Sequence, residues 1–192
     1  MLGYGGNESL TGYPRLYIAS HGDHEGGNTS AHTAHLVGST LSDPYLAYSG
    51  ALFALAGPLH GLANQVVLRW QMAMQKELRT NITHEDIRAV TSGRRSRVAI
   101  YGHGVLRNPD PRFIALQEFC QGKPELKESL IVDLVNKTFE AAPDVLKEHG
   151  KTKNPWPNVD ATSGCVLYHY GLTEFKYYTV IFGVLRALGC LT

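Results

Sequence analysis

Hydrophobic residues recur at helical spacing along most of the chain, and no segment sustains the alternation of apolar and polar residues that is typical of a β-strand. The pattern predicts helices over these approximate ranges: Thr29–Thr40, Pro44–Ala56, Leu62–Leu78, a segment after Thr83, a segment after Asp110, Glu125–Ala142, Pro143–Gly150, Asp160–Tyr170 and Thr173–Leu188. We therefore expect an all-α protein. The helix over Pro44–Ala56 is apolar almost all round, which predicts that it is buried.

Residues suited to helix ends flank these segments. They are Asn28, Asp43 before Pro44, Thr83 with Asp86, Asp110 before Pro111, Gly150 and Gly189. Ala31, Ala34 and Gly38 share one helical face, and such small residues favour close packing against another helix. The segments Gly93–Gly104 and Lys151–Asn158 are interpreted as loops, because the first has no apolar period and the second holds two prolines.

Composition limits the class of protein. The chain has 192 residues, of which 43% are hydrophobic and 18% charged, and its formal net charge is +1. These values argue against disorder and give no general support for nucleic-acid binding. The longest apolar stretches are too short to span a bilayer, so no membrane association is expected. The three cysteines are far apart, which favours a reducing compartment, and no targeting segment is recognisable at the start.

The first candidate for chemistry is the histidine-rich segment from His21 to His35. Zinc binding is one interpretation, although the histidine spacing matches no common zinc motif. Alternatively, some of these histidines satisfy buried helix ends. A third possibility is that Gly26-Gly27 forms a tight turn beside a ligand and directs His24 into a pocket.

His60 lies between a helix break and a new helix start. A helix N-terminus disfavours the imidazolium ion, so this histidine is expected to stay neutral and able to donate a hydrogen bond to a developing enolate oxygen. The alternative is a capping histidine without chemistry.

Three further segments hold charged candidates. Five arginines surround Tyr101 and His103 between residues 94 and 112, which suits an anionic small molecule or nucleotide-like cofactor, or else a solvated basic loop. Asp160 follows a stiff Pro-Trp-Pro unit and is either a base or an N-cap. Arg186 interrupts an apolar helix and so needs an anionic partner. Together the candidates suit proton abstraction next to a carbonyl in an acidic substrate.

Six motifs then identify a family resemblance. They are DHEGGN-SAHT-HLVGS at Asp23–Ser39, LAGPLHGLANQ at Leu55–Gln65, YGH-VLR at Tyr101–Arg107, DPR at Asp110–Arg112, NPWPNVDA-SG at Asn154–Gly164 and YYTV-FGV-RALG at Tyr177–Gly189. The chain closely resembles citrate synthase of the eukaryotic, mitochondrial type, essentially from end to end. The resemblance implies an all-α fold in which residues 1–60 and 166–192 belong to an incomplete large domain and residues 61–165 form the small domain. It also implies a homodimer and a mitochondrial matrix location.

The resemblance further implies a role for each matching residue. His60 would donate to the thioester carbonyl of acetyl-CoA, Asp160 would take the methyl proton, and His103 would protonate the carbonyl of oxaloacetate. Oxaloacetate would be bound by His24, Arg112, Phe182 and Arg186, and CoA by Arg107 and Asn158. Citryl-CoA would then be hydrolysed to citrate and CoA, with no metal or other cofactor.

The sequence departs from the family pattern in ways that bear on this activity. Ala99-Ile100 replaces Pro-Gly beside the CoA path, and Thr162 stands where the family has histidine. The resemblance also implies that the chain begins at an internal methionine and lacks both the N-terminal half and the C-terminal segment, which would expose faces such as that of Pro44–Ala56. Two alternatives to an active citrate synthase therefore stay open. The first is a catalytically inactive truncated paralogue or fragment, and the second is a 2-methylcitrate synthase that uses propionyl-CoA.

Overall fold

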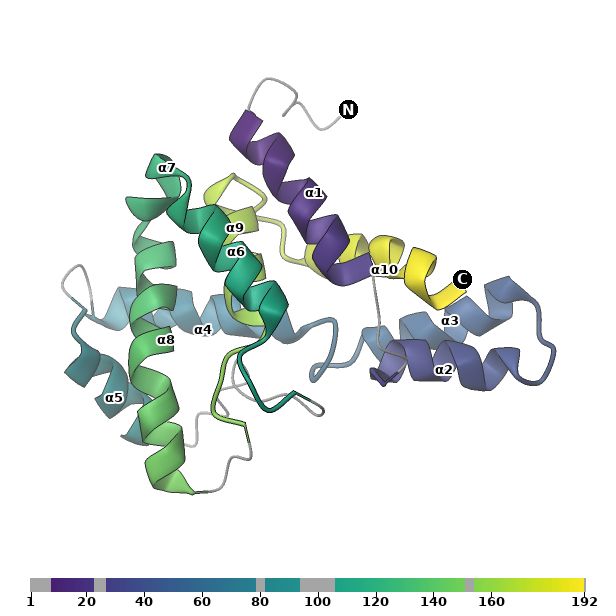
Figure 1. Cartoon of the computed structure of the whole chain (residues 1–192), viewed down its shortest axis with the longest axis horizontal. Helices are drawn as coiled ribbons and strands as arrows, with labels where there is room; N and C mark the ends of the chain where they lie inside the picture. Colours follow the sequence, from purple (N-terminus) through teal and green to yellow (C-terminus); the bar gives the residue numbers. More distant parts are fainter. Residues whose placement is uncertain (1–7, 23–26, 79–81, 94–105, 151–153, 192) are drawn as a thin grey trace. The chain divides into compact units, whose positions relative to one another are not determined.

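The computed structural model describes residues 8–22, 27–78, 82–93, 106–150 and 154–191. Within these ranges the chain forms ten helices and no β-strand, which confirms the all-α prediction (Figure 1). It divides into two compact units. The first joins Met1–Ala63 to Glu174–Thr192, and the second is Asn64–Thr173. None of the described helices is long and apolar enough to cross a membrane.

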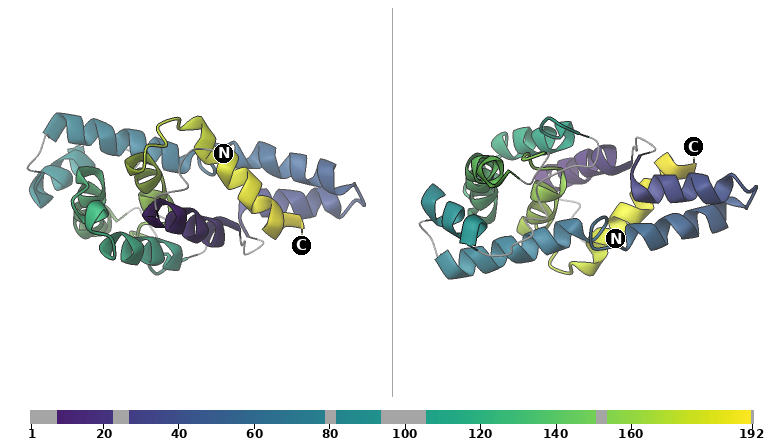
Figure 2. Two further views of the ribbon diagram at one scale, coloured as in Figure 1. Left: turned by 90° about the horizontal axis from the view of Figure 1, so that it is seen from above. Right: turned by 90° about the horizontal axis from the view of Figure 1, so that it is seen from below.

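The first unit is built from four helices: α1 (Glu8–Gly22), α2 (Thr29–Gly38), α3 (Pro44–Leu55) and α10 (Lys176–Leu191). α2 and α3 lie side by side, as the views in Figure 2 also show, and α10 contacts α1, α2 and α3. The predicted small-residue face is confirmed for Ala31 and Ala34, which are buried against Ala51 and Cys190. The hydroxyl of Tyr48 donates to the carbonyl oxygen of Gly183 and so links α3 to α10.

The prediction that α3 is buried all round is wrong. Its small residues face the other helices, and Ala51 is only 1% exposed. Leu55 at its end is buried as well, but Tyr45 and Phe53 point away from the other helices and are 86% and 82% exposed. The family resemblance led to the other expectation, that a face of this helix is exposed, and the structure confirms it.

The second unit contains six helices: α4 (Ala63–Leu78), α5 (His84–Gly93), α6 (Pro111–Gln121), α7 (Pro124–Lys127), α8 (Leu130–His149) and α9 (Asp160–His169). α9 forms its centre, because every residue from Ala161 to Leu167 is buried. α4 passes close to α9 at Gly164, where an added Cβ would lie 3.1 Å from the carbonyl oxygen of Asn64.

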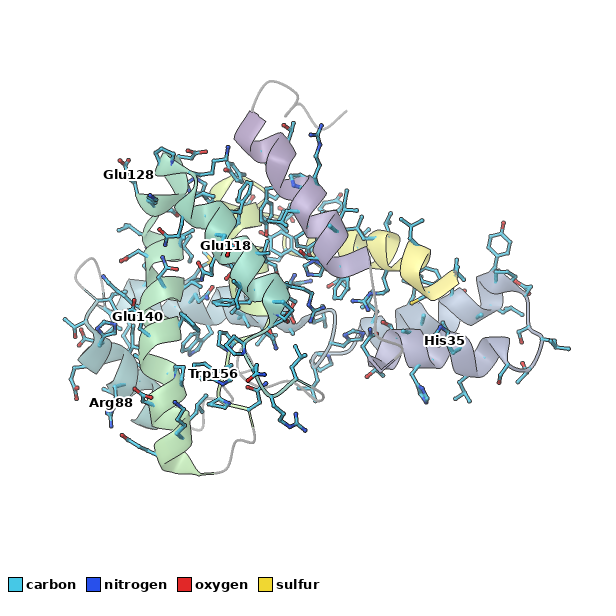
Figure 3. The ribbon with its side chains drawn as sticks, in the orientation of Figure 1. His35, Arg88, Glu118, Glu128, Glu140 and Trp156 are labelled. Atoms are coloured by element: carbon cyan, nitrogen blue, oxygen red, sulfur yellow. The ribbon has the colours of Figure 1, made fainter. Side chains whose placement is uncertain are left out.

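α5 packs against α8 at the edge of this unit. Two exposed ion pairs join the helices there. Nε2 of His84 lies 2.7 Å from Glu140, and Arg88 binds Glu148 through both carboxylate oxygens. Arg88 and Glu140 are labelled in Figure 3. Exposed pairs of this kind are screened by solvent, so we assign them no role in the site.

Several predicted helix ends are confirmed. Asn28, Asp43 and Asp110 each accept a backbone hydrogen bond from the first turn of the helix that follows. Thr83 and Asp86 bond reciprocally. Gly150 ends α8 in the left-handed conformation, with φ of 68°.

Other boundaries were predicted wrongly. α1 was not predicted at all. Glu125–Ala142 and Pro143–Gly150 are instead the short α7 and a continuous α8 that runs through Pro143. Gly189 lies inside α10 rather than at its end. A proline inside a helix costs about 3 kcal/mol. α8 nevertheless continues through Pro143, and the neighbouring Ala142 and Val145 are buried.

Candidate active site

His60 lies in the turn between α3 and α4, as its sequence context predicted. Two hydrogen bonds of the next residue, Gly61, hold this turn in place, one through its N–H and one through its carbonyl. The N–H of Gly61 donates to the carbonyl of Leu55 at the end of α3, with N···O 2.8 Å. The hydroxyl of Thr179 on α10 donates to the carbonyl of Gly61 at 2.8 Å. The imidazole is therefore held at a defined place beside α3 and α10.

The imidazole of His60 contacts the first turn of α2 rather than the helix that it precedes. Its Nε2 lies 2.8 Å from Oγ of Ser30 and 3.4 Å from the backbone nitrogen of Ser30. The hydroxyl of Ser30 in turn donates to Oδ1 of Asn28 at 2.9 Å. Nε2 of His60 is thus joined to a serine that is hydrogen-bonded to the N-cap of α2.

The pKa of His60 is lowered from 6.5 to about 4, first by burial and then by the positive charge of Arg186. This direction confirms the predicted neutral imidazole. The causes differ from the predicted one, which was the start of the next helix. A neutral ring keeps one nitrogen as a donor at physiological pH.

Two predicted residues on α10 lie beside this histidine. The ring of Phe182 meets the His60 ring edge to face, with centroids 5.8 Å apart. The guanidinium carbon of Arg186 lies 4.9 Å from the centroid of Phe182, and Arg186 is only 2% exposed. A buried positive charge of this kind suits an anionic ligand or a carboxylate. The first unit therefore brings His60, Phe182 and Arg186 together.

The histidine-rich segment divides into different environments. His21 is buried in the last turn of α1, where it contacts the carbonyl of Tyr17 at 2.9 Å and stacks on the Tyr17 ring. His32 and His35 are exposed on α2. His24 lies outside the described residues. Among those described, no group of three or more His, Cys, Asp or Glu residues has the geometry of a metal site.

In the second unit, Arg112 is held by Asp110. The Nε and Nη2 atoms of Arg112 donate to the two carboxylate oxygens of Asp110 at 3.0 and 2.8 Å. The Asp110 side chain is 1% exposed and that of Arg112 is 29% exposed. The carboxylate also accepts the backbone N–H of Val159 at 3.1 Å. Arg112 is thus fixed at the start of α6 with part of its guanidinium open to solvent.

Asp160 opens α9. The N-cap position belongs to Val159, so the alternative interpretation of Asp160 as an N-cap is wrong. Asp160 is partly buried in the first turn, where the helix dipole stabilises a carboxylate. The side chain of Asn158 accepts the N–H of Asp160 at 3.0 Å.

The segment before Asp160 is tied to the chain that follows the arginine-rich region. The side chain of Asn154 donates to the carbonyl of Leu106 at 2.8 Å and accepts the N–H of Trp156 at 2.9 Å. Trp156, labelled in Figure 3, lies under the Lys147 ammonium group at 4.9 Å. Arg107 is exposed next to this junction. His103 and Ile100 lie outside the described residues.

The three cysteines are buried, and burial raises the pKa of each: that of Cys120 to about 12, that of Cys165 well above its ordinary value, and that of Cys190 as well. Burial and a raised pKa make a thiol a poor nucleophile. Sequence reasoning missed Ser30 as a partner of His60, because the two residues are 30 positions apart. It saw Asp110 only as a helix cap.

Comparison with known proteins gives a consistent result. The family model for the C-terminal domain of citrate synthase matches residues 1–192. The chain is similar to the mitochondrial 2-methylcitrate synthase of Aspergillus fumigatus, with 57% identity over 100% of this chain and 42% of that protein. It is also similar to the mitochondrial citrate synthase of Daucus carota, with 54% identity over 98% of this chain and 40% of that protein.

A solved structure agrees with these relatives. The citrate synthase of Pyrobaculum aerophilum superposes with a TM-score of 0.81 and 28% identity, covering 100% of this chain and 46% of that one. The chain therefore spans about two fifths of the length of the curated relatives that it matches.

Proposed function

Because this chain belongs to the citrate synthase family, we propose that the protein containing it condenses acetyl-CoA with oxaloacetate and water to give citrate and CoA. The observation that carries the proposal is the state of His60. This imidazole is neutral, because burial and the charge of Arg186 lower its pKa to about 4, and it lies beside the buried Arg186. Such a group can donate a hydrogen bond to a thioester oxygen as negative charge develops on it.

The proposed reaction begins at the methyl group of acetyl-CoA. Asp160 removes a methyl proton while His60 donates to the thioester carbonyl oxygen, so that an enol or enolate forms. Its methylene carbon attacks the keto carbon of oxaloacetate, and His103 protonates the new alkoxide. Water then hydrolyses the thioester of citryl-CoA to citrate and CoA.

Binding of the substrates is proposed to rest on positive charge. Arg112, Arg186 and His24 pair with the carboxylates of oxaloacetate, and Phe182 lines the same pocket. Arg107 and Asn158 contact CoA. We propose no metal or cofactor, since histidine and arginine side chains supply the stabilisation of negative charge that the reaction needs.

The test is release of CoA from acetyl-CoA in the presence of oxaloacetate, measured with the full-length protein. We expect Asp160→Asn to lower kcat by about 10²- to 10⁴-fold, because it removes the general base. His35→Gln is the matched control, since it changes an exposed histidine on α2. Equal rates for wild type and Asp160→Asn would exclude the proposed mechanism. Activity confined to the full-length protein would identify this chain alone as a non-catalytic fragment.

A second candidate activity is supported by the names of the relatives. The protein from Aspergillus fumigatus that is 57% identical is a 2-methylcitrate synthase, which favours propionyl-CoA as an additional or preferred substrate. One methylene group in a pocket changes kcat/KM by about 10- to 200-fold. The ratio of kcat/KM for the two thioesters therefore decides between them.

The location and assembly are proposed on the same basis. The relatives from Aspergillus fumigatus and Daucus carota are both named as mitochondrial, and we propose the mitochondrial matrix for this protein. We also propose that it acts as a homodimer. Organelle fractionation tests the first proposal, and sedimentation of the full-length protein tests the second.

A further inference from the structure

Asp110 makes more hydrogen bonds than helix capping requires. Oδ1 accepts the backbone N–H of Arg112 at 2.9 Å and its Nε–H at 3.0 Å. Oδ2 accepts from Nη2 of Arg112 at 2.8 Å and from the backbone N–H of Val159 at 3.1 Å. Three elements meet at one carboxylate: the cap of α6, the Arg112 side chain and the residue before Asp160.

The chain contains an internal comparison for this arrangement. Asp43 also precedes a proline at the start of a helix, and its Oδ1 accepts the N–H groups of Tyr45 and Leu46 at 2.9 and 3.1 Å. Asp43 is exposed, and these bonds stay within its own helix start. Capping α6 therefore explains only one of the four bonds that Asp110 accepts.

We propose that Asp110 is a positioning residue that fixes the Arg112 guanidinium and the start of α9, with Asp160, in one arrangement for catalysis. This inference rests on the proposed function, because it gives Arg112 and Asp160 their roles in oxaloacetate binding and proton abstraction. Asp110 itself touches neither substrate in this scheme.

The geometry gives this arrangement a defined effect on Arg112. A guanidinium group carries five N–H donors in a planar fork. Asp110 binds the edge made of Nε and Nη2, which fixes the plane of the fork and the direction of the edge made of Nη1 and Nη2. That second edge has the right geometry for bidentate pairing with a carboxylate.

The charge of Asp110 supports the same role. Burial alone would raise its pKa, but the hydrogen bonds and positive charge of Arg112, together with the N–H of Val159, lower the pKa below its ordinary value. Asp110 therefore stays ionised at neutral pH and neutralises a buried part of the Arg112 guanidinium.

The experiment is a double-mutant cycle in the full-length protein, read as the dissociation constant of oxaloacetate by calorimetry and as kcat. Asp110→Asn keeps a good N-cap but removes the charge and replaces one acceptor by a donor. We expect oxaloacetate binding to weaken by about 10- to 100-fold. In an Arg112→Gln background, the same change should weaken binding by less than about 2-fold. Asp43→Asn is the matched control and should leave both readings unchanged.

The outcomes separate the two proposals. If the wild-type protein neither binds nor consumes oxaloacetate, the proposed function fails and the positioning role fails with it. If the wild-type protein is active and Asp110→Asn weakens binding equally in both backgrounds, only the positioning role is overturned, since Asp110 then acts independently of Arg112. A role confined to structure would change the unfolding temperature without this dependence on Arg112.

A second variant keeps the inference testable if Asp110→Asn does not fold. Val159→Pro removes the single N–H that Asp110 accepts from the start of α9, and φ of Val159, −56°, is compatible with proline. We expect kcat to fall by about 10-fold, because Asp160 shifts, while oxaloacetate binding stays within about 2-fold. An unchanged kcat in a folded Val159→Pro protein would overturn the link between Asp110 and α9.

Discussion

Gly61→Ala is the sharpest test of how the turn at His60 is built. A Cβ at residue 61 would lie 2.4 Å from the carbonyl oxygen of Leu55 and 2.9 Å from its Cγ. That carbonyl is also the acceptor of the Gly61 N–H at 2.8 Å. The clash is therefore with a backbone atom that cannot rotate away.

The cost follows from two contributions. An ordinary contact needs a separation of about 3.4 Å, so the turn must move by about 1 Å, and overpacking of this kind costs about 1–3 kcal/mol. The movement also weakens the Gly61–Leu55 hydrogen bond and the bond from Thr179 to the Gly61 carbonyl, each worth about 1 kcal/mol. We expect a loss of about 2–4 kcal/mol in the free energy of unfolding.

The assay is urea unfolding of the full-length protein, together with the rate of CoA release. Gly38→Ala is the control, because it adds the same methyl group at the end of α2, where nothing lies within 4 Å of the new Cβ. The control should leave stability unchanged or raise it slightly. Gly61→Ala should also lower kcat by about 10²-fold, since it displaces His60 by about 1 Å. Equal stability of the two variants would refute the geometry of this turn.

Three further predictions concern stability. Between pH 6.5 and pH 4, unfolded His60 binds a proton that folded His60 does not, so the wild-type protein loses stability as the pH falls through this range. The loss is about 1–2 kcal/mol after solvent screening, and pH-dependent urea unfolding should show a smaller loss in His60→Gln. Asn28→Ala removes the cap of α2 and should cost about 1 kcal/mol in the same assay, whereas an unchanged midpoint would contradict the capping role. Gly164→Ala places a Cβ 3.1 Å from the Asn64 carbonyl and should cost about 1 kcal/mol, and a stabilised variant would contradict this close approach of α4 to α9.

Local sequence signals located most helices of the described chain. Asp43-Pro44 and Asp110-Pro111 predicted two helix starts correctly, because an aspartate cap and a proline at the first position act within a few residues. Asn28 did the same for α2. α1 escaped prediction because it contains Pro14, which argues against a helix locally, and it packs through the buried Tyr13 and Tyr17.

Burial was less predictable than helix position. An apolar sequence such as that of α3 does not say which face meets a neighbour. The small side chains of Ala47 and Ala51 allow close approach of other helices, so they are buried, while Phe53 is left exposed. The direction of packing depends on side-chain size across the interface, and a single sequence does not contain the partner surface.

In the candidate site too, the sequence predicts the contacts between neighbouring residues but not those between distant ones. Asp43 and Asp110 stand in identical Asp-Pro pairs, and both cap a helix. Only Asp110 accepts a bond from a residue 49 positions away, at Val159, and only its side chain is placed at 1% exposure beside a guanidinium. The energetic difference between them comes from burial, because a carboxylate removed from water must be fully hydrogen-bonded to stay ionised. In the sequence, helix capping is a sufficient reason for an aspartate at position 110, so the sequence gives no sign of a second role. Only the tertiary contacts show that Arg112 and the start of α9 depend on the same carboxylate.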